Sequence, residues 1–218
     1  MQFEFFDPQG EVYVHYRRLP HWEQAGVLAF VTWRTIDSIP EEVLRRWRVE
    51  RAGWLRQQGI DPRDENWRDG FNTLSRQARR DYHERFTNRW MEFLDKGHGA
   101  CALRRPELSA IVAKSLLHDD GRSYVVSDFV VMPNHVHVLA QFHVEGDMKR
   151  WCKSWKHWTA GQINKALLQS GRFWQVESFD HLVRSPEQFE FLRRYVAENP
   201  IVAGLKEGEY RLYSRAEK

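Results

Sequence analysis

The chain has 218 residues, enough for one domain with a sizeable core, and its 42% hydrophobic and 14% aromatic content excludes disorder as the main state. No run approaches about 18 consecutive apolar residues, which excludes a membrane-spanning helix, and the N-terminus lacks the basic start and apolar run of a signal peptide. The net charge is only +3, and two cysteines are too few for a disulfide scaffold or a zinc cluster. We therefore expect a cytoplasmic protein with reduced thiols.

One strand followed by helices is predicted for the first part of the chain. Residues 27–35 are rich in β-branched and aromatic side chains, which is typical of a strand. Pro40, followed by two glutamates, is a favourable helix start, and we expect this helix to run to about Gln58. Apolar side chains recur at every fourth position from Leu74 to Leu94, which predicts one long amphipathic helix.

Helices and strands alternate in the remainder of the chain. The expected elements are a helix from Pro106 to about residue 118, strands over 124–132 and 135–142, a helix over 148–168, an extended or irregular stretch over 173–183, and a helix over 186–198 that ends at Asn199 and Pro200. Only two residues separate the two strands, so they should pair as an antiparallel hairpin. Strands interleaved with helices, at least one pair being antiparallel, predict the α+β class.

Two histidines alternate with valines on the second of these strands. His135 and His137 should leave the same face of the sheet, while Val136 and Val138 point the other way into apolar packing. Two imidazoles on one face can hold a first-row transition-metal ion, although two partly exposed histidines without a ligand would show the same pattern. Leu139 stands where a histidine-triad phosphotransferase would need a third histidine, and a two-histidine phosphoesterase would need a second copy of the motif, which is absent.

Tyr195 and Asn199 are four residues apart at the end of the last predicted helix. This spacing places them on one side of the helix, one turn apart, so a phenol and a carboxamide can approach one target together. A tyrosine at the edge of an apolar stripe is also an ordinary packing residue, and an asparagine before a proline commonly ends a helix. The pair alone leaves both interpretations open.

Positive charge is concentrated over residues 148–172, which contain six basic and no acidic residues. Four of the six cluster at the start of the predicted helix: Lys149, Arg150, Lys153 and Lys156. Trp151, Trp155 and Trp158 follow helical spacing, and we expect them to form a buried stripe with the basic side chains reaching outward beside it. Such a surface is either a solvated basic face or one that follows the phosphates of a nucleic acid.

The segment from Met132 to Leu139, Met-Pro-Asn-His-Val-His-Val-Leu, resembles the signature of the HUH single-tyrosine transposases, in which a bulky apolar residue separates two histidines. The chain is similar in particular to the REP-associated tyrosine transposases, which are linked to repetitive extragenic palindromes. Further matching blocks follow in the same order and spacing: residues 155–156 with 159–160, 173–175, 179–181, 195–200 and 203–205. The resemblance covers roughly residues 27–214. It departs at Val202, where the family often has a basic residue, and at 212–214, where the family often has Trp-Ser-Ser.

This resemblance implies a fold and a role for each matching residue. Tyr195 would be the nucleophile, His135 and His137 would be metal ligands, and Asn199 would take the place of the polar third ligand. The implied fold is ferredoxin-like, an antiparallel sheet with helices on one face and the two histidines on a central strand. Residues 1–218 would form a single domain of this kind, with a helical insertion at about 40–96 that is longer than in compact members of the family.

The function implied by the resemblance is cleavage and rejoining of single-stranded or hairpin DNA through a 5′-phosphotyrosine intermediate, as in transposition of repetitive palindromic elements. The cofactor would be a divalent metal ion, Mg²⁺ or Mn²⁺, and the four clustered cations named above would contact DNA. The protein would act as a monomer or homodimer in the cytoplasm, associated with the nucleoid when bound to DNA. Two alternatives stay open: a nucleic-acid-binding protein of the same fold without catalysis, and a metal-dependent phosphoesterase.

Overall fold

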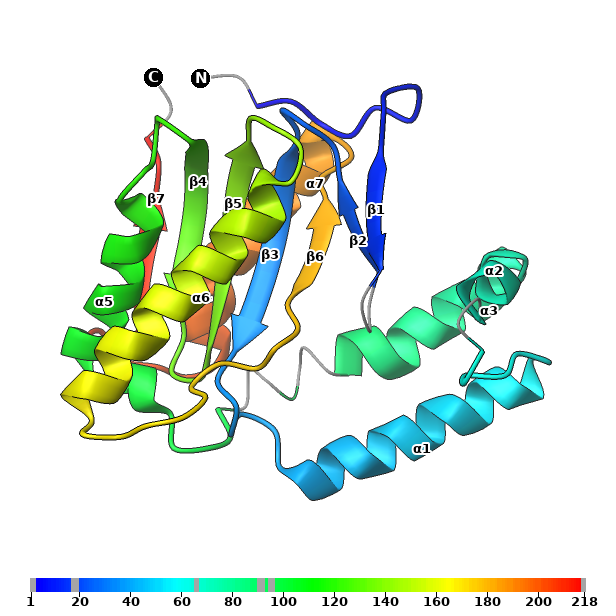
Figure 1. The fold of residues 1–218 in the computed structure, drawn as a ribbon, viewed down its shortest axis with the longest axis horizontal. Coiled ribbons are helices and arrows are strands. Elements are labelled where there is room, and N and C mark those ends of the chain that lie inside the picture. The colour runs from blue at the N-terminus through cyan, green and yellow to red at the C-terminus, as the bar shows by residue number, and fades with distance from the viewer. Residues whose placement is uncertain (1–2, 17–19, 65–66, 90–92, 94–96, 217–218) are drawn as a thin grey trace. The chain divides into compact units, whose positions relative to one another are not determined.

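A computed structural model describes residues 3–16, 20–64, 67–89, 93 and 97–216 of the chain (Figure 1). The chain divides into two compact units. Met1–Ile36 together with Ala100–Lys218 form the first, here named the sheet unit, and Asp37–Gly99 form the second, the helical unit. Among the helices in the described part of the chain, none combines the length and apolar character that crossing a bilayer requires.

The sheet unit is built on five strands that are antiparallel to their neighbours. In spatial order they are β6 (Phe179–Leu182), β3 (Leu28–Arg34), β5 (His135–Phe142), β4 (Tyr124–Val131) and β7 (Arg211–Ser214). A separate hairpin of β1 (Tyr13–Tyr16) and β2 (Pro20–Glu23) precedes them and was not predicted, nor was β7. The three predicted strands are confirmed, and the strand that carries the two histidines is the central one.

Helices cover both faces of this sheet. α5 (Pro106–Leu117) and α6 (Asp147–Ala166) lie on one face and α7 (Pro186–Val202) lies on the other (Figure 1). Apolar side chains that alternate along β3 and β5, among them Val31 and Val138, form the core under α5 and α6 together with Leu108 and Val112 of α5. The α+β class predicted from the sequence is confirmed.

The chain order β3-α5-β4-β5-α6-β6, with β3 placed between β6 and β5, is the ferredoxin-like arrangement. The expectation that helices cover only one face of the sheet is wrong. α7 has its own apolar stripe, which includes Leu192 and Val196, and this stripe is buried on the face that α5 and α6 leave open.

A bulge interrupts β4 between Val126 and Asp128. Val126 and Phe129 both belong to the core under α5 and α6, although strict alternation would place them on opposite faces. The extra residue turns Asp128 toward the α7 face, where the residue is buried.

α7 continues beyond the point where the sequence predicts its end. Asn199 and Pro200 were expected to stop the helix, but it runs to Val202 with Pro200 inside it. Pro200 lacks the N–H that would bond the carbonyl of Val196, yet the N–H of Ala203 bonds the carbonyl of Asn199 at 3.0 Å and closes the last turn. Asn199 is therefore a helical residue, one turn after Tyr195.

The helical unit contains α1 (Glu41–Gln57), α2 (Trp67–Asn72) and α3 (Arg76–Tyr82), with a π-helical segment over His83–Asn88 directly after α3. α1 buries the apolar face that its sequence predicts. The single regular helix predicted over 74–94 is wrong at His83, where π-helical hydrogen bonding begins; Tyr82 and Phe86 both pack against Trp54 across this change. Residues 90–92 and 94–96 of that prediction lie outside the described part of the chain.

The two ends of the helical unit meet. Gly99 adopts a φ of +93°, and a Cβ atom placed on it would stand 2.7 Å from the carbonyl oxygen of Asp37. Both the backbone angle and the close approach therefore require glycine at this position.

Candidate active site

The two histidines of β5 are fully buried on the α7 face, and neighbours on the same sheet fix both rings. His135 Nδ1 lies 2.7 Å from Asn134 Oδ1, and His137 Nδ1 lies 2.7 Å from the hydroxyl of Thr32 on β3. Because a carboxamide oxygen only accepts, His135 donates from Nδ1 and keeps the lone pair at Nε2. The two Nε2 atoms converge to 3.0 Å.

This convergence fits a shared metal ion. Two nitrogen ligands about 2.1 Å from one ion, at the right angle of an octahedral site, stand about 3.0 Å apart, which is the observed spacing of the Nε2 atoms. Burial, and then the neighbouring His135, hold the pKa of His137 well below its usual value, so that imidazole is neutral at pH 7. A neutral imidazole with its Nδ1 held by a hydrogen bond is the form that binds metals.

Tyr195 of α7 lies beside the two histidines. Its hydroxyl lies 3.5 Å from His137 Nε2, and its ring meets the His137 ring edge to face with centroids 5.2 Å apart. Phe30 of β3 stacks on the His137 ring with centroids 5.4 Å apart and also contacts the Tyr195 ring at 6.1 Å, so the three rings pack against one another. The structure thus brings together a phenol and two imidazoles from segments 58 residues apart in sequence.

Asn199 lies on the same helix, one turn after Tyr195, and the residue is 3% exposed. In the described part of the chain, no group of three or more His, Cys, Asp or Glu side chains is placed to hold a metal ion. The carboxamide of Asn199 carries an oxygen of a kind that can bind a divalent ion beside two imidazoles.

Sequence reasoning missed the residues that hold these groups in place. Thr32 and Phe30 alternate on β3, opposite His137 and Leu139 in the ladder, so strand pairing would have found them once the order of strands was known. Asn134 was assigned only to the turn. Arg193 Nε on α7 donates to Asp128 Oδ2 on β4 at 3.1 Å. The sequence pattern did not predict this pair, because the bulge turns Asp128 to the face opposite the one that alternation along β4 implies.

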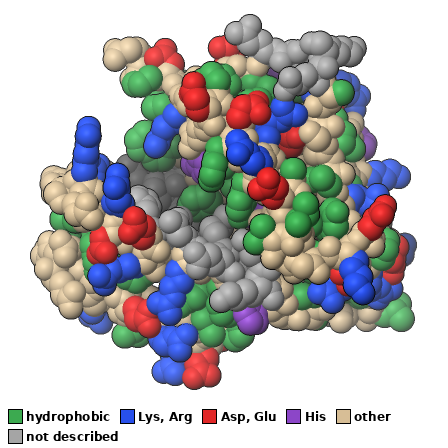
Figure 2. Space-filling model, turned by 180° about the vertical axis from the view of Figure 1, so that it is seen from behind, with side chains coloured by type: hydrophobic (Ala, Val, Ile, Leu, Met, Phe, Trp, Pro, Cys, Tyr) green, Lys and Arg blue, Asp and Glu red, His purple; other side chains and the backbone are tan. Residues whose placement is uncertain are grey.

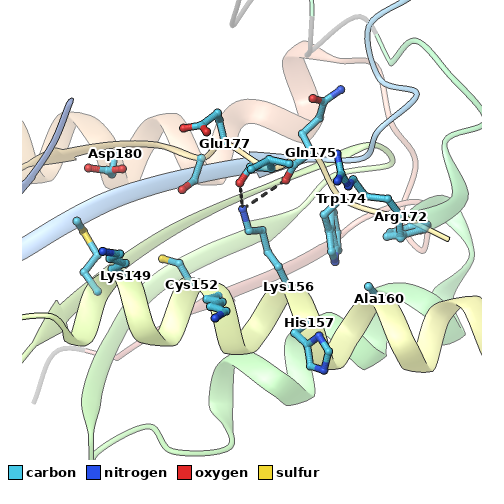
Figure 3. Close-up of a pocket in the computed structure, with 15 residues that line it drawn as sticks. Lys149, Cys152, Lys156, His157, Ala160, Arg172, Trp174, Gln175, Glu177 and Asp180 are labelled. Atoms are coloured by element: carbon cyan, nitrogen blue, oxygen red, sulfur yellow. Dashed lines mark hydrogen bonds between the residues drawn. The ribbon is translucent and has the colours of Figure 1, made fainter. Parts of the chain in front are cut away.

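The predicted DNA-contacting cations of α6 differ in what they already bind. A cavity of about 300 Å³ separates α6 from residues 172–180, with Lys149 and Lys153 among its lining residues (Figure 3). Lys156 reaches across this cavity and donates to the carbonyls of Val176 at 2.7 Å and Gln175 at 3.3 Å (Figure 3). Arg150 is paired with Asp147 at 3.5 Å and lies over the ring of Trp151.

The buried face of α6 is not the predicted tryptophan stripe. Trp155 is buried and Trp151 half-buried, but Trp158 is 43% exposed. The buried row of the helix instead comprises Asp147, Met148, Cys152, Trp155, Thr159 and Ile163. Burial, followed by the charge of Asp180, raises the pKa of the Cys152 thiol, and Cys101 and Cys152 are both free.

On the face seen from behind the sheet, the described side chains form no cluster of one charge sign like that at the start of α6. There, Lys and Arg side chains are interspersed with Asp and Glu side chains rather than gathered by sign (Figure 2). The concentration of cations along the start of α6 is therefore a local feature.

No family model matches the sequence, and no curated protein matches it. One solved structure, described as the structure of the REP associates tyrosine transposase bound to a REP hairpin, is similar at a TM-score of 0.40 and 14% sequence identity, over 88% of this chain and 76% of that one. Likeness of this degree decides nothing about the chemistry of this chain, which depends on the side chains described above.

Proposed function

We propose that this protein is a metal-dependent DNA strand transferase that cleaves and rejoins single-stranded or hairpin DNA with Tyr195 as nucleophile. The observation that carries the proposal is the 3.5 Å approach of the Tyr195 hydroxyl to a pair of buried imidazoles whose Nε2 atoms converge to 3.0 Å. The order of sequence blocks shared with REP-associated tyrosine transposases, from Met132 to Leu205, supports the choice of DNA as substrate.

The chemistry follows from the groups that meet at this site. A free tyrosine has a pKa near 10 and a phosphodiester is an anion, so the uncatalysed attack is slow at neutral pH. Tyr195 would attack phosphorus as its phenol gives up its proton to solvent, forming the bond from Oη to phosphorus and breaking the bond to the 3′ oxygen, which takes up a proton from solvent and leaves as a 3′-hydroxyl. The product is a 5′-phosphotyrosine, and attack by another 3′-hydroxyl reverses the step. Joining then needs no ATP because the phosphoester bond is conserved.

His135, His137 and Asn199 would hold a divalent ion. When bound, such an ion supplies neutralisation of the charge that develops on the phosphate oxygens and the phenol. Two imidazoles and one carboxamide should accept Mn²⁺ readily and Mg²⁺ more weakly. Phe30 and Thr32 keep the His137 ring in one orientation, so the phenol and the imidazoles are organised before substrate arrives.

DNA would be held outside the reacting centre by phosphate contacts. Lys149 and Lys153 are exposed near the start of α6, and neither forms an ion pair with a residue in the described ranges. Phosphate contacts of this kind position a strand without reading its sequence. A nucleoid-associated location, in DNA-bound form, follows from the same proposal.

The decisive experiment is incubation with end-labelled hairpins that carry random single-stranded tails, in the presence of Mn²⁺, followed by a denaturing gel. We expect a covalent protein–DNA band from wild type and from Tyr210→Phe, a matched control that removes another phenol of the sheet unit. Tyr195→Phe should give no band while binding DNA nearly as well as wild type, because only the hydroxyl is lost. A band from Tyr195→Phe would contradict the assignment of the nucleophile. Binding without a band from wild type would favour the binding protein without catalysis.

A further inference from the structure

Two side chains on α7 reach the sheet on opposite edges of the buried stripe. Successive helical residues are about 100° apart around the axis, so Arg193 and Tyr195 are separated by about 160°. Leu192, Val196 and Asn199 lie between them and are buried. Tyr195 contacts Phe30 of β3 and His137 of β5, whereas Arg193 contacts β4 and β7.

The Arg193 side of the helix ends in a dense polar cluster. Arg193 Nε donates to Asp128 Oδ2 at 3.1 Å, and the two side chains are 19% and 4% exposed. The hydroxyls of Ser127 and Ser214 also donate to the Asp128 carboxylate, and Arg193 Nη2 donates to Ser214 Oγ at 3.3 Å. The carboxylate is buried and accepts several hydrogen bonds. The two side chains of this ion pair are therefore held in one geometry more firmly than those of an exposed pair.

We propose that Arg193 and Asp128 are positioning residues that set the rotation of α7 about its own axis and so hold the Tyr195 hydroxyl against His137. The inference deepens the proposed function and rests on it for its catalytic consequence. Apolar packing of Leu192 and Val196 holds the helix on the sheet but tolerates rolling, because apolar contacts have no preferred direction. A charged hydrogen bond on one edge of the stripe is directional and resists that roll.

The reaction requires a precisely placed Tyr195 hydroxyl, so the hydrogen bond between Arg193 and Asp128 should affect its rate. The tyrosine hydroxyl lies on the order of 8 Å from the helix axis, so a roll of about 10° displaces it by more than about 1 Å. A displacement of about 1 Å between reacting groups can lower a rate by about 100-fold. Substrate binding through the cations of α6, on the other face of the sheet, does not depend on this angle.

The first test separates the rate of the reaction from DNA affinity. We expect Asp128→Asn and Arg193→Gln to lower the single-turnover rate of adduct formation at saturating DNA by ten- to a hundredfold, with Kd changed less than threefold. Arg193→Lys should recover part of the rate, and the double variant should be no slower than the slower single variant, since both disable one interaction. Arg194→Gln removes the same charge one residue later, from an exposed side chain, and should react like wild type. Rates of Asp128→Asn and Arg193→Gln equal to that of wild type would overturn the inference.

The second test does not require catalysis. 3-Fluorotyrosine introduced at position 195 should give a ¹⁹F resonance that shifts or broadens in Asp128→Asn and stays in place in Arg194→Gln, with unchanged far-UV circular dichroism in both. If wild type forms no adduct but this resonance still responds, the proposed function fails and the positioning role stands. An unmoved resonance in Asp128→Asn and in Arg193→Gln would overturn the positioning role even in an active enzyme.

Discussion

The cations of α6 allow a quantitative prediction about DNA affinity. Each phosphate of a single strand that is neutralised by a cation contributes about −0.7 to the slope of log K against log salt concentration. Counting Lys149, Lys153 and Lys156 from the sequence alone would give a change of about 2 on replacing all three. In the structure the ammonium of Lys156 is already held by the carbonyls of Gln175 and Val176, which leaves two free lysines.

We therefore expect Lys149→Gln/Lys153→Gln to make the slope shallower by about 1.4, so a tenfold rise in salt should weaken wild-type binding by about 25-fold more than that of the double variant. Adding Lys156→Gln should leave the slope unchanged and instead lower thermal stability, because two carbonyls lose their donor. Fluorescence anisotropy over a salt series, on a matched and a scrambled strand, measures the slopes, and thermal denaturation followed by circular dichroism measures the stability.

Two controls accompany this measurement. Lys114→Gln removes an exposed lysine from α5 and should not change the slope. Affinity should fall equally for matched and scrambled strands, since phosphate contacts carry no sequence information. An unchanged slope in the double variant would show that this face of α6 is merely solvated. A slope change on Lys156→Gln as large as that on Lys153→Gln would refute the reasoning from the hydrogen bonds.

Three further outcomes are expected. His135→Ala and His137→Ala should each abolish Mn²⁺-dependent cleavage, because one imidazole and one amide hold a divalent ion poorly. Asn199→Ala should also lose activity, and excess Mn²⁺ should recover part of it. Full wild-type activity in the presence of a chelator would refute the assignment of all three residues as metal ligands. Cleavage should require single-stranded DNA near the cut, since a duplex hides its base faces, and equal rates on a perfect duplex would indicate an ordinary endonuclease. Burial, and then the charge of Arg184, lower the pKa of His181 from 6.5 to about 4. Between these pH values the unfolded chain binds a proton that the folded chain does not. The free energy of unfolding should therefore be highest above pH 6.5 and fall by up to about 3 kcal/mol as the pH is lowered towards 4. His181→Gln should remove that part of the pH dependence in urea titrations, and an unchanged pH profile would show that this histidine is not buried as described.

Local pattern was enough for the features that depend on local geometry. Alternation on a strand predicted that His135 and His137 share a face, and the two-residue turn before them predicted the hairpin of β4 and β5. Helical spacing predicted that Tyr195 and Asn199 share a side of α7, which holds because the helix continues past Pro200.

Features that depend on packing between distant segments could not be predicted in this way. The meeting of Tyr195 with His137 requires α7 to lie on the face that α5 and α6 leave free, and no local pattern specifies a face. Strict alternation along β4 would place Asp128 on the face of α5 and α6, and no local pattern announces the bulge that turns it to the α7 face. Lys156 looked like any other exposed cation, since the carbonyls that hold it lie 19 and 20 residues further along the chain.

The contact between Gly99 and the carbonyl of Asp37 has a consequence for how this protein could change over evolution. The segment between them leaves and re-enters the sheet unit through neighbouring residues, in the way that one domain is inserted into a loop of another. It also has its own apolar clusters, around Trp47 and around Trp54. Because the two ends of the segment adjoin, we expect that it could be lengthened, replaced or reduced to a short turn while the strand order of the sheet and the pairing of its histidine strand are retained.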